Sequence, residues 1–169
     1  MNLASLIRDR AQIDPAARAV RGPDETLGYG ALDARADQVS HALRELGVRA
    51  GDRVALWTEK SARGVAVMQG ILRAGAVYVP IDPLGPLLRA RRILEDCDVQ
   101  CVFTSGRRAA ALATGAAQMR FLTCDERAEA SSFAPELEGR SWLSWDDVTR
   151  LPTTPLPTPR GGDDLAYIL

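Results

Sequence analysis

The chain has 169 residues and a formal net charge of -1 at pH 7, so it carries no basic surplus typical of nucleic-acid or membrane binding. No apolar run approaches the ~20 residues needed to cross a bilayer. The N-terminus has charged residues at Arg8 and Asp9, where a secretory signal would be apolar. We therefore expect a cytoplasmic protein whose partners include neither nucleic acid nor membrane.

The first third of the chain predicts two helices and two short extended segments. Apolar residues at helical spacing predict a helix over 3–13, which ends before Pro15. Residues 27–30 predict a short strand or turn, and a second helical pattern covers 32–46. The apolar run over 52–58 is typical of a strand.

The middle of the chain continues this alternation. Ser61 is expected to cap a helix that is apolar on nearly all sides and therefore packed on more than one side. Gly75 is expected to close that helix in the left-handed conformation, and residues 76–82 then alternate as a strand. Pro86 suits the start of the next helix, and residues 99–104 predict a further strand.

A helix over 107–113 and a strand over 119–124 complete the pattern. Strands separated by helices predict an α/β fold with a mostly parallel sheet, because a parallel partner requires the chain to cross back over one face. Short crossovers further predict that the strands at 54–57, 77–81 and 99–103 are neighbours in the core of that sheet.

The pattern weakens after Cys124. Residues 125–139 predict a long loop or a partly disordered segment, although Trp142 and Trp145 are expected to anchor the chain a little later. Prolines over 151–159 indicate an extended surface connector. We accordingly divide the chain into an α/β core fragment (1–124), an irregular and Pro-rich connector (125–160) and the start of a strand (161–169).

Few residues suggest chemistry, and none is nominated as catalytic, cofactor-binding or metal-binding. The three cysteines, at 97, 101 and 124, lack the ligand spacing of a zinc site, and Cys101 lies in an apolar strand. His41 lies on a helix without an evident catalytic partner. Lys60 is the single lysine and precedes a helix start. Asp82 is expected to cap the turn through Pro83.

One stretch carries a resemblance to a known family. Residues 72–83 resemble the Leu-Lys-Ala-Gly-x-Ala-Tyr-Val-Pro-x-Asp core motif of adenylate-forming enzymes. This family includes the amino-acid-activating domains of nonribosomal peptide synthetases, acyl-CoA synthetases and luciferases. Arg73 replaces the usual Lys, and Val77 the usual Ala. Three other segments, 27–32, 51–55 and 164–168, are similar to further family motifs in the expected order.

The resemblance implies that the chain is the N-terminal portion of the large lobe of an AMP-forming ligase. Such an enzyme would use ATP and Mg²⁺ to activate an amino acid or other carboxylic acid as an acyl-adenylate. It would then transfer the acyl group to the phosphopantetheine thiol of a carrier protein or of CoA. The sequence Tyr78–Asp82 favours the peptide-synthetase branch.

In the family, the strand that resembles 165–169 leads into a phosphate-binding loop. That loop is absent from these residues, so we expect the chain alone to be catalytically inactive and to hold no cofactor. Its first partner would then be the remainder of its own polypeptide.

Two alternatives belong to different classes. One is a self-contained α/β module that binds a nucleotide at its strand ends, although no Gly-x-Gly-x-x-Gly or Walker loop follows a strand. The other is a protein-interaction module that contacts a partner through an open sheet.

Overall fold

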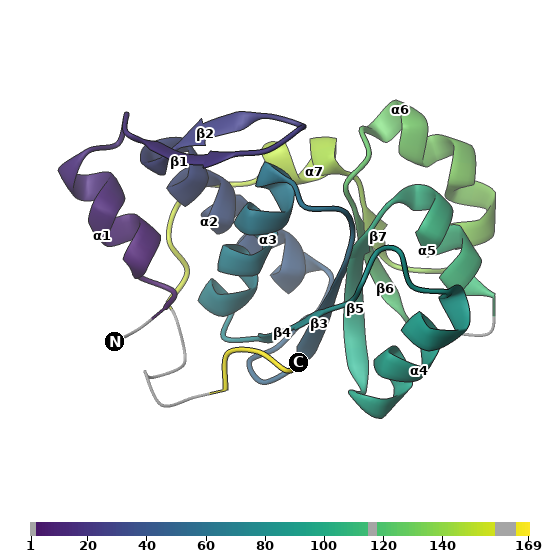
Figure 1. The fold of residues 1–169 in the computed structure, drawn as a ribbon. Coiled ribbons are helices and arrows are strands. Elements are labelled where there is room, and N and C mark those ends of the chain that lie inside the picture. Colours follow the sequence, from purple (N-terminus) through teal and green to yellow (C-terminus); the bar gives the residue numbers. More distant parts are fainter. Residues whose placement is uncertain (1–2, 115–117, 158–164) are drawn as a thin grey trace.

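A parallel sheet lies between two layers of helices in the computed structural model, which describes residues 3–114, 118–157 and 165–169 (Figure 1). All neighbouring strands of this five-stranded sheet are parallel. In spatial order they are β4 (Val77–Pro80), β3 (Arg53–Trp57), β5 (Val99–Thr104), β6 (Arg120–Thr123) and β7 (Trp142–Leu143). The α/β class is therefore confirmed, as is the prediction that the three core strands are neighbours, with β3 in the centre.

The helices cover both faces of the sheet, as Figure 1 shows. One face carries α2 (Tyr29–Glu45), α3 (Ala62–Arg73) and α7 (Trp145–Thr149), and α1 (Leu6–Ile13) packs on α2. The other face carries α4 (Leu87–Asp96) and α5 (Gly106–Ala113), with α6 (Arg127–Ala130) and the 3-10 helix η1 (Ser131–Leu137) packed against α5. No helix among the described residues is both long and apolar enough to span a membrane.

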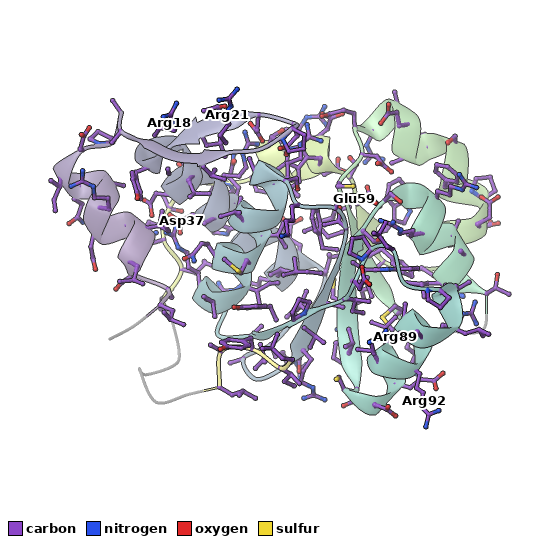
Figure 2. All side chains as sticks on the ribbon, viewed as in Figure 1. Arg18, Arg21, Asp37, Glu59, Arg89 and Arg92 are labelled. Atoms are coloured by element: carbon purple, nitrogen blue, oxygen red, sulfur yellow. The ribbon has the colours of Figure 1, made fainter. Side chains whose placement is uncertain are left out.

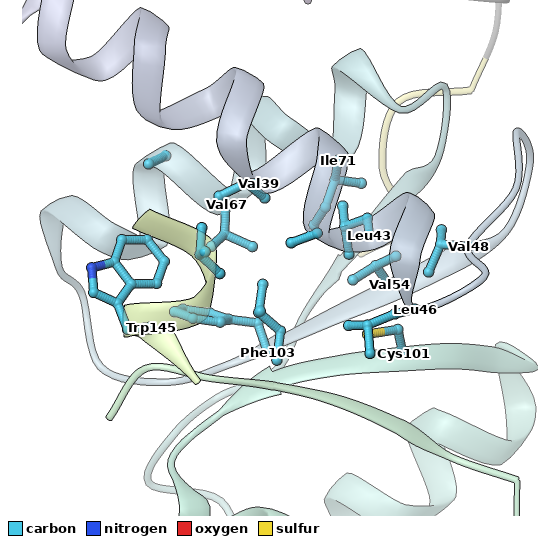
Figure 3. Packing of buried hydrophobic residues seen from close by; sticks show 14 of the residues in the cluster. Val39, Leu43, Leu46, Val48, Val54, Val67, Ile71, Cys101, Phe103 and Trp145 are labelled. Carbon is cyan, nitrogen blue, oxygen red and sulfur yellow. The ribbon is translucent and has the colours of Figure 1, made fainter. Parts of the chain in front are cut away.

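Strand alternation divides the apolar side chains between the two faces. In β3, Val54 packs toward α2 and α3, whereas its neighbour Ala55 packs toward α4 and α5. Figure 3 shows the first of these clusters, in which Phe103 of β5 lies beneath Val67 of α3 and beside Trp145 of α7. Because both faces of the central strands are buried, their sequences are apolar runs rather than alternating ones.

The predicted local signals at both ends of α3 are confirmed. The Ser61 hydroxyl accepts a hydrogen bond from the Gly64 amide at 2.9 Å, so Ser61 is the N-cap. After the helix ends, Gly75 has φ = 72°, a left-handed conformation that glycine adopts without strain. These two residues fix the length of the helix and turn the chain directly into β4.

A buried ionic cluster joins the helices on the first face. Arg73 of α3 has 3% of its side chain exposed and Asp37 of α2 has 2%, and their charged atoms are 2.9 Å apart. Arg73 also pairs with Asp33, and Arg8 of α1 pairs with Asp37 at 2.6 Å. Buried charges are retained only when they are paired, so this cluster fixes the register of three helices.

The structure corrects the sequence analysis in two places. An antiparallel hairpin of β1 (Arg18–Arg21) and β2 (Thr26–Gly28) lies over α2 and α3, and only its second strand was expected. The loop expected over 125–139 is wrong, because α6 and η1 occupy 127–137. Their short lengths and mixed composition give no clear period. The division at residues 124 and 160 stays a prediction, with β7 and α7 arising inside the expected connector.

The C-terminal part of the described chain returns to the sheet and to α2. Gln38 of α2 donates hydrogen bonds to the carbonyls of Thr149 and Leu151, and His41 Nε2 lies 2.9 Å from the Thr154 carbonyl. These contacts hold residues 151–157 against α2. Residues 165–169 form one parallel bridge, Tyr167 to Tyr78, beside β4. Residues 158–164 of the expected connector and strand lie outside the described residues.

Candidate functional site

The sheet topology places one crevice where ligands bind in folds of this kind. The helix after β3 covers one face of the sheet, whereas the helix after β5 covers the other. The chain therefore leaves these neighbouring strands in opposite directions, which opens a crevice at their carboxyl ends. Open α/β sheets bind ligands at such a switch point, so the crevice between β3 and β5 is the candidate site.

A carboxylate of the chain itself caps the N-terminus of α3 at this edge. Asp24, from the turn of the β1–β2 hairpin, accepts hydrogen bonds from the amides of Ala62 and Arg63 at 2.8 and 3.0 Å. Burial opposes ionisation of Asp24, but these amide contacts outweigh it and hold the pKa of the carboxyl below its ordinary value. Gly22 permits this close approach, because a Cβ there would lie 2.6 Å from the Ala62 nitrogen.

The N-terminus of α5 is occupied in the same way. Asp125, just after β6, accepts a hydrogen bond from the Gly106 amide at 2.5 Å. The Ser105 hydroxyl caps the same helix by accepting from the Arg108 amide. Both helix N-termini that flank the crevice are thus paired with acceptors from this chain. Those amides are the groups that would otherwise bind an anionic ligand.

An arginine side chain crosses the crevice. Arg108 of α5 pairs with Glu59, which follows β3, at 2.8 Å, and donates to the Pro83 carbonyl at 2.9 Å. Its guanidinium lies 5.1 Å from the ring centroid of Trp57. The hydrogen bond from Arg108 holds the pKa of Glu59 below its ordinary value. One side chain therefore ties together the exits of β3 and β4 and the start of α5.

Further contacts join the remaining strand exits. The Thr104 hydroxyl donates to the Trp57 carbonyl at 2.7 Å, across β5 and β3. Arg63 of α3 donates to the Cys124 carbonyl at 2.6 Å and pairs with Glu126 at 2.5 Å. The polar groups at this edge pair largely with one another, so the arrangement fastens the strand ends in place rather than presenting reactive groups.

Residues singled out from the sequence are dispersed over the structure. Asp82 caps the turn through Pro83 as expected, with its Oδ1 accepting from the Leu84 amide at 2.9 Å. Lys60 is exposed next to the crevice. His41 faces the 151–157 segment on the outer side of α2. The structure does not bring these residues together.

The cysteines are unpaired and two of them are strongly desolvated. Burial raises the pKa of Cys101 to about 12 and that of Cys124 to about 11. Both thiols are therefore protonated near neutral pH, when a cysteine nucleophile would need to be a thiolate. Within the described ranges, no group of three or more His, Cys, Asp or Glu side chains is placed to hold a metal ion.

Sequence reasoning missed Asp24, Asp125 and Arg108 as the residues that organise this edge. Asp24 precedes the helix that it caps by 38 residues. Asp125 follows the start of its helix by 19 residues, after α5 and β6. The Gly-Pro-Asp turn at 22–24 indicates a bend, but nothing local links it to Ala62. The amides of Ala62, Arg63 and Gly106 already donate hydrogen bonds to Asp24 and Asp125. The described residues at this edge therefore do not offer these amides to the phosphates of a nucleotide.

Comparison with known proteins identifies the family. Residues 7–169 match the AMP-binding enzyme family. The chain is 38% identical over 156 residues to an L-proline--[L-prolyl-carrier protein] ligase of Pseudomonas fluorescens, covering 92% of this chain and 29% of the ligase. The chain thus spans less than a third of the length of that relative.

Solved structures share the fold. The anthranilate CoA ligase AuaEII, in complex with anthranoyl-AMP, superposes with a TM-score of 0.82 at 24% identity, over 99% of this chain and 31% of the ligase. The nonribosomal peptide synthetase FmoA3 in its AMPPNP-bound form gives a TM-score of 0.74 at 31% identity, over 98% of this chain and 16% of FmoA3. With a family match that covers nearly the whole sequence, this chain belongs to the AMP-binding enzymes.

Proposed function

We propose that this chain forms the N-terminal portion of the large lobe of an AMP-forming ligase. The ligase would activate an amino acid or other carboxylic acid with ATP and transfer it to the phosphopantetheine thiol of a carrier protein or CoA. The observation that carries this proposal is the match of residues 7–169 to the AMP-binding enzyme family, and the 38% identity to a carrier-protein ligase supports it. Mg²⁺ as the metal and the cytoplasm as the location stay predictions.

The geometry supports a scaffolding role for these residues within such an enzyme. Residues 165–169 run parallel to β4, so Leu169 lies toward the carboxyl edge of the sheet, near the exit through Asp82. Chain that follows Leu169 would emerge at the edge where α/β enzymes bind ligands. The contacts of Arg108, Asp24 and Asp125 hold that edge rigid, which is what a neighbouring phosphate-binding loop requires.

A first experiment separates the scaffold from the chemistry. We expect the purified 169-residue chain to show ATP–pyrophosphate exchange no greater than a blank, and a protein extended beyond Leu169 to show exchange with an amino, aryl or fatty acid. Adenylyl transfer needs positioned cations and backbone donors around the phosphates. Among the described residues, the amides of Ala62, Arg63 and Gly106 beside the crevice are already hydrogen-bonded to carboxylates of this chain. Robust exchange by the 169-residue chain, abolished in Lys60→Ala, would contradict the proposal.

The alternative of a self-contained nucleotide-binding module is disfavoured by the capped helices. Calorimetric titration of the chain with ATP and with AMP would test it directly. Micromolar binding that is lost when Arg108 is replaced by Gln would favour the module, because the ligand would then occupy the crevice that Arg108 crosses.

A further inference from the structure

A hollow opens at the opposite edge of the sheet from the crevice. Its volume is about 800 Å³, and it lies at the amino ends of β3, β5 and β6. The lining includes Arg44 at the end of α2, Arg49 in the loop before β3, Gln100 of β5 and Arg120 of β6, with Leu156 and Pro157 of the segment held on α2. A volume of this size suits a small-molecule ligand.

Three guanidinium groups in this lining have no carboxylate partner among the residues that the structure describes. Within residues 3–114, 118–157 and 165–169, the side chains of Arg44 and Arg49 form no ion pair or hydrogen bond. Arg120 has a single long hydrogen bond, from Nη1 to the Gly47 carbonyl at 3.4 Å. Arg73 also lines the hollow, but its charge is already balanced in the buried cluster with Asp33 and Asp37.

The one carboxylate in the lining does not neutralise these cations. Asp52 uses its Oδ2 to accept a hydrogen bond from the backbone amide of Arg49 at 2.8 Å, which shapes the turn before β3. Three arginines that lack a carboxylate partner among the described residues thus line the hollow together with one carboxylate. Many other arginines of the protein, such as Arg8, Arg63 and Arg108, are paired with carboxylates.

The helix dipole accounts for only part of this arrangement. Arg44 lies in the last turn of α2, where a cation stabilises the negative end of the helix. Arg49 belongs to a loop, and Arg120 belongs to a strand much later in the sequence. Neither residue is therefore needed to stabilise the negative end of α2. Apart from the hydrogen bond of Arg120 to the Gly47 carbonyl, no side-chain hydrogen bond or ion pair among residues 3–114, 118–157 and 165–169 accounts for their place beside Arg44 in one hollow.

We propose that this hollow binds a compact, multiply charged phosphate anion, of the size and charge of inorganic pyrophosphate. Planar guanidinium groups donate paired hydrogen bonds to phosphate oxygens, and three of them match an anion with at least two negative charges. The site lies at the amino edge of the sheet and is independent of the chemistry proposed for the carboxyl edge.

Calorimetric titration with inorganic pyrophosphate tests the proposal, using a matched pair of double variants. Arg44→Gln/Arg49→Gln removes two charges from the hollow. Arg18→Gln/Arg21→Gln removes two exposed arginines of the β1–β2 hairpin, which have no ion pair with another described residue and lie at the far edge of the molecule (Figure 2). We expect Arg44→Gln/Arg49→Gln to weaken pyrophosphate binding at least about tenfold, because each of its two substitutions removes charge-assisted hydrogen bonds. Arg18→Gln/Arg21→Gln should change the affinity by less than about twofold, because charges this far from the hollow are screened by salt.

Three results would overturn the proposal. They are no measurable binding of pyrophosphate by the unaltered protein, equal weakening in the two double variants, and binding of citrate as tight as that of pyrophosphate. Equal weakening would mean attraction by overall charge, and equal citrate affinity would mean that phosphate geometry is not recognised. Arg120→Gln provides a second test of the same hollow, and matching thermal melting curves would show that the variants are folded.

Discussion

Asp24 shows how much of the carboxyl edge depends on single side chains. Its carboxylate accepts hydrogen bonds from the Ala62 and Arg63 amides at the start of α3, and so connects the β1–β2 hairpin to the helix that follows β3. Asp125, which follows β6, accepts a hydrogen bond from one amide at the start of α5, that of Gly106. Each is an N-terminal cap supplied by a remote segment, so each stabilises tertiary structure and helix together.

Replacing Asp24 by Ala should lower the free energy of unfolding by about 1 kcal/mol at pH 7, the usual cost of losing a helix cap. The pKa of Asp24 is lowered in the folded protein, so its contribution is complete above the unfolded pKa and is lost as the pH falls through the folded pKa. Urea unfolding should therefore show a difference between the two proteins that shrinks in acid, below about pH 4.

Asp96→Ala is the matched control for this variant. Asp96 is exposed, and the one ion pair that it forms with a described residue, Arg92, is 3.9 Å long. Its removal should change the free energy of unfolding by less than about 0.5 kcal/mol at any pH. A loss in Asp24→Ala that is constant down to pH 2 would show that the charge of Asp24 does not supply the stabilisation.

At the scale of elements, Gly70 marks a close contact between α2 and α3. A Cβ at Gly70 of α3 would lie 2.4 Å from Cγ1 of Val39 on α2, and 2.9 Å from the Ala36 carbonyl. The paired charges of Asp37 and Arg73 lie along the same contact. Gly70 therefore sets the distance at which the buried ionic cluster can form.

Gly70→Ala should destabilise the protein by about 1–3 kcal/mol, because overpacking outweighs the better helix propensity of alanine. In the double variant Val39→Ala/Gly70→Ala, removal of two methyl groups relieves part of the clash. The double variant should thus be more stable than the sum of the single changes predicts, by at least about 0.5 kcal/mol in urea unfolding. Strict additivity would show that the two helices separate instead of clashing.

The elements that could be predicted from the sequence are those with strong local signals. The apolar period and the Ser61 and Gly75 signals locate α3, and apolar runs locate β3, β4 and β5. The β1 strand could not be predicted from the sequence, because its two outer residues are arginines, Arg18 and Arg21, and only two partly buried residues lie between them. Helix α6 and η1 are too short for any period to emerge.

At the scale of the whole molecule, the alternation of helices and strands was enough to predict a parallel sheet and the adjacency of β3, β4 and β5. It could not reveal the contacts that close the carboxyl edge, because Arg108 and Glu59, or Asp24 and Ala62, meet only after the sheet has formed. The hollow at the amino edge was hidden for the same reason, since Arg44 and Arg120 are distant in sequence.

The pairing of residues 165–169 with β4 gives a prediction for the whole molecule. Tyr78 exchanges backbone hydrogen bonds with Ala166 and Ile168, each 3.1 Å long, and its ring stacks on that of Tyr167 with centroids 5.3 Å apart. A chain that ends at residue 164 loses this cover and leaves β4 as a free edge. It should self-associate, because an uncovered strand edge pairs with other chains.

Light scattering of the shortened chain checks this outcome. Leu165→Ser is the control, since it removes an exposed apolar side chain from the same segment without a change in the bridge. The control should scatter like the unaltered protein. If the shortened chain also remained monodisperse, the β4 edge would be protected by something other than the 165–169 segment.

The order of the strands has a consequence for synthesis on the ribosome. β4 is added beside β3, β5 on its other side, then β6 and β7, so each strand finds its partner already made. Residues 165–169 alone must return to the older edge at β4. At a translation rate of about 5–20 residues per second, the outer edge of β4 stays unpaired for on the order of ten seconds before residues 165–169 are made. The nascent chain is therefore most exposed to wrong pairing, and to capture by chaperones, when most of its sheet is already built.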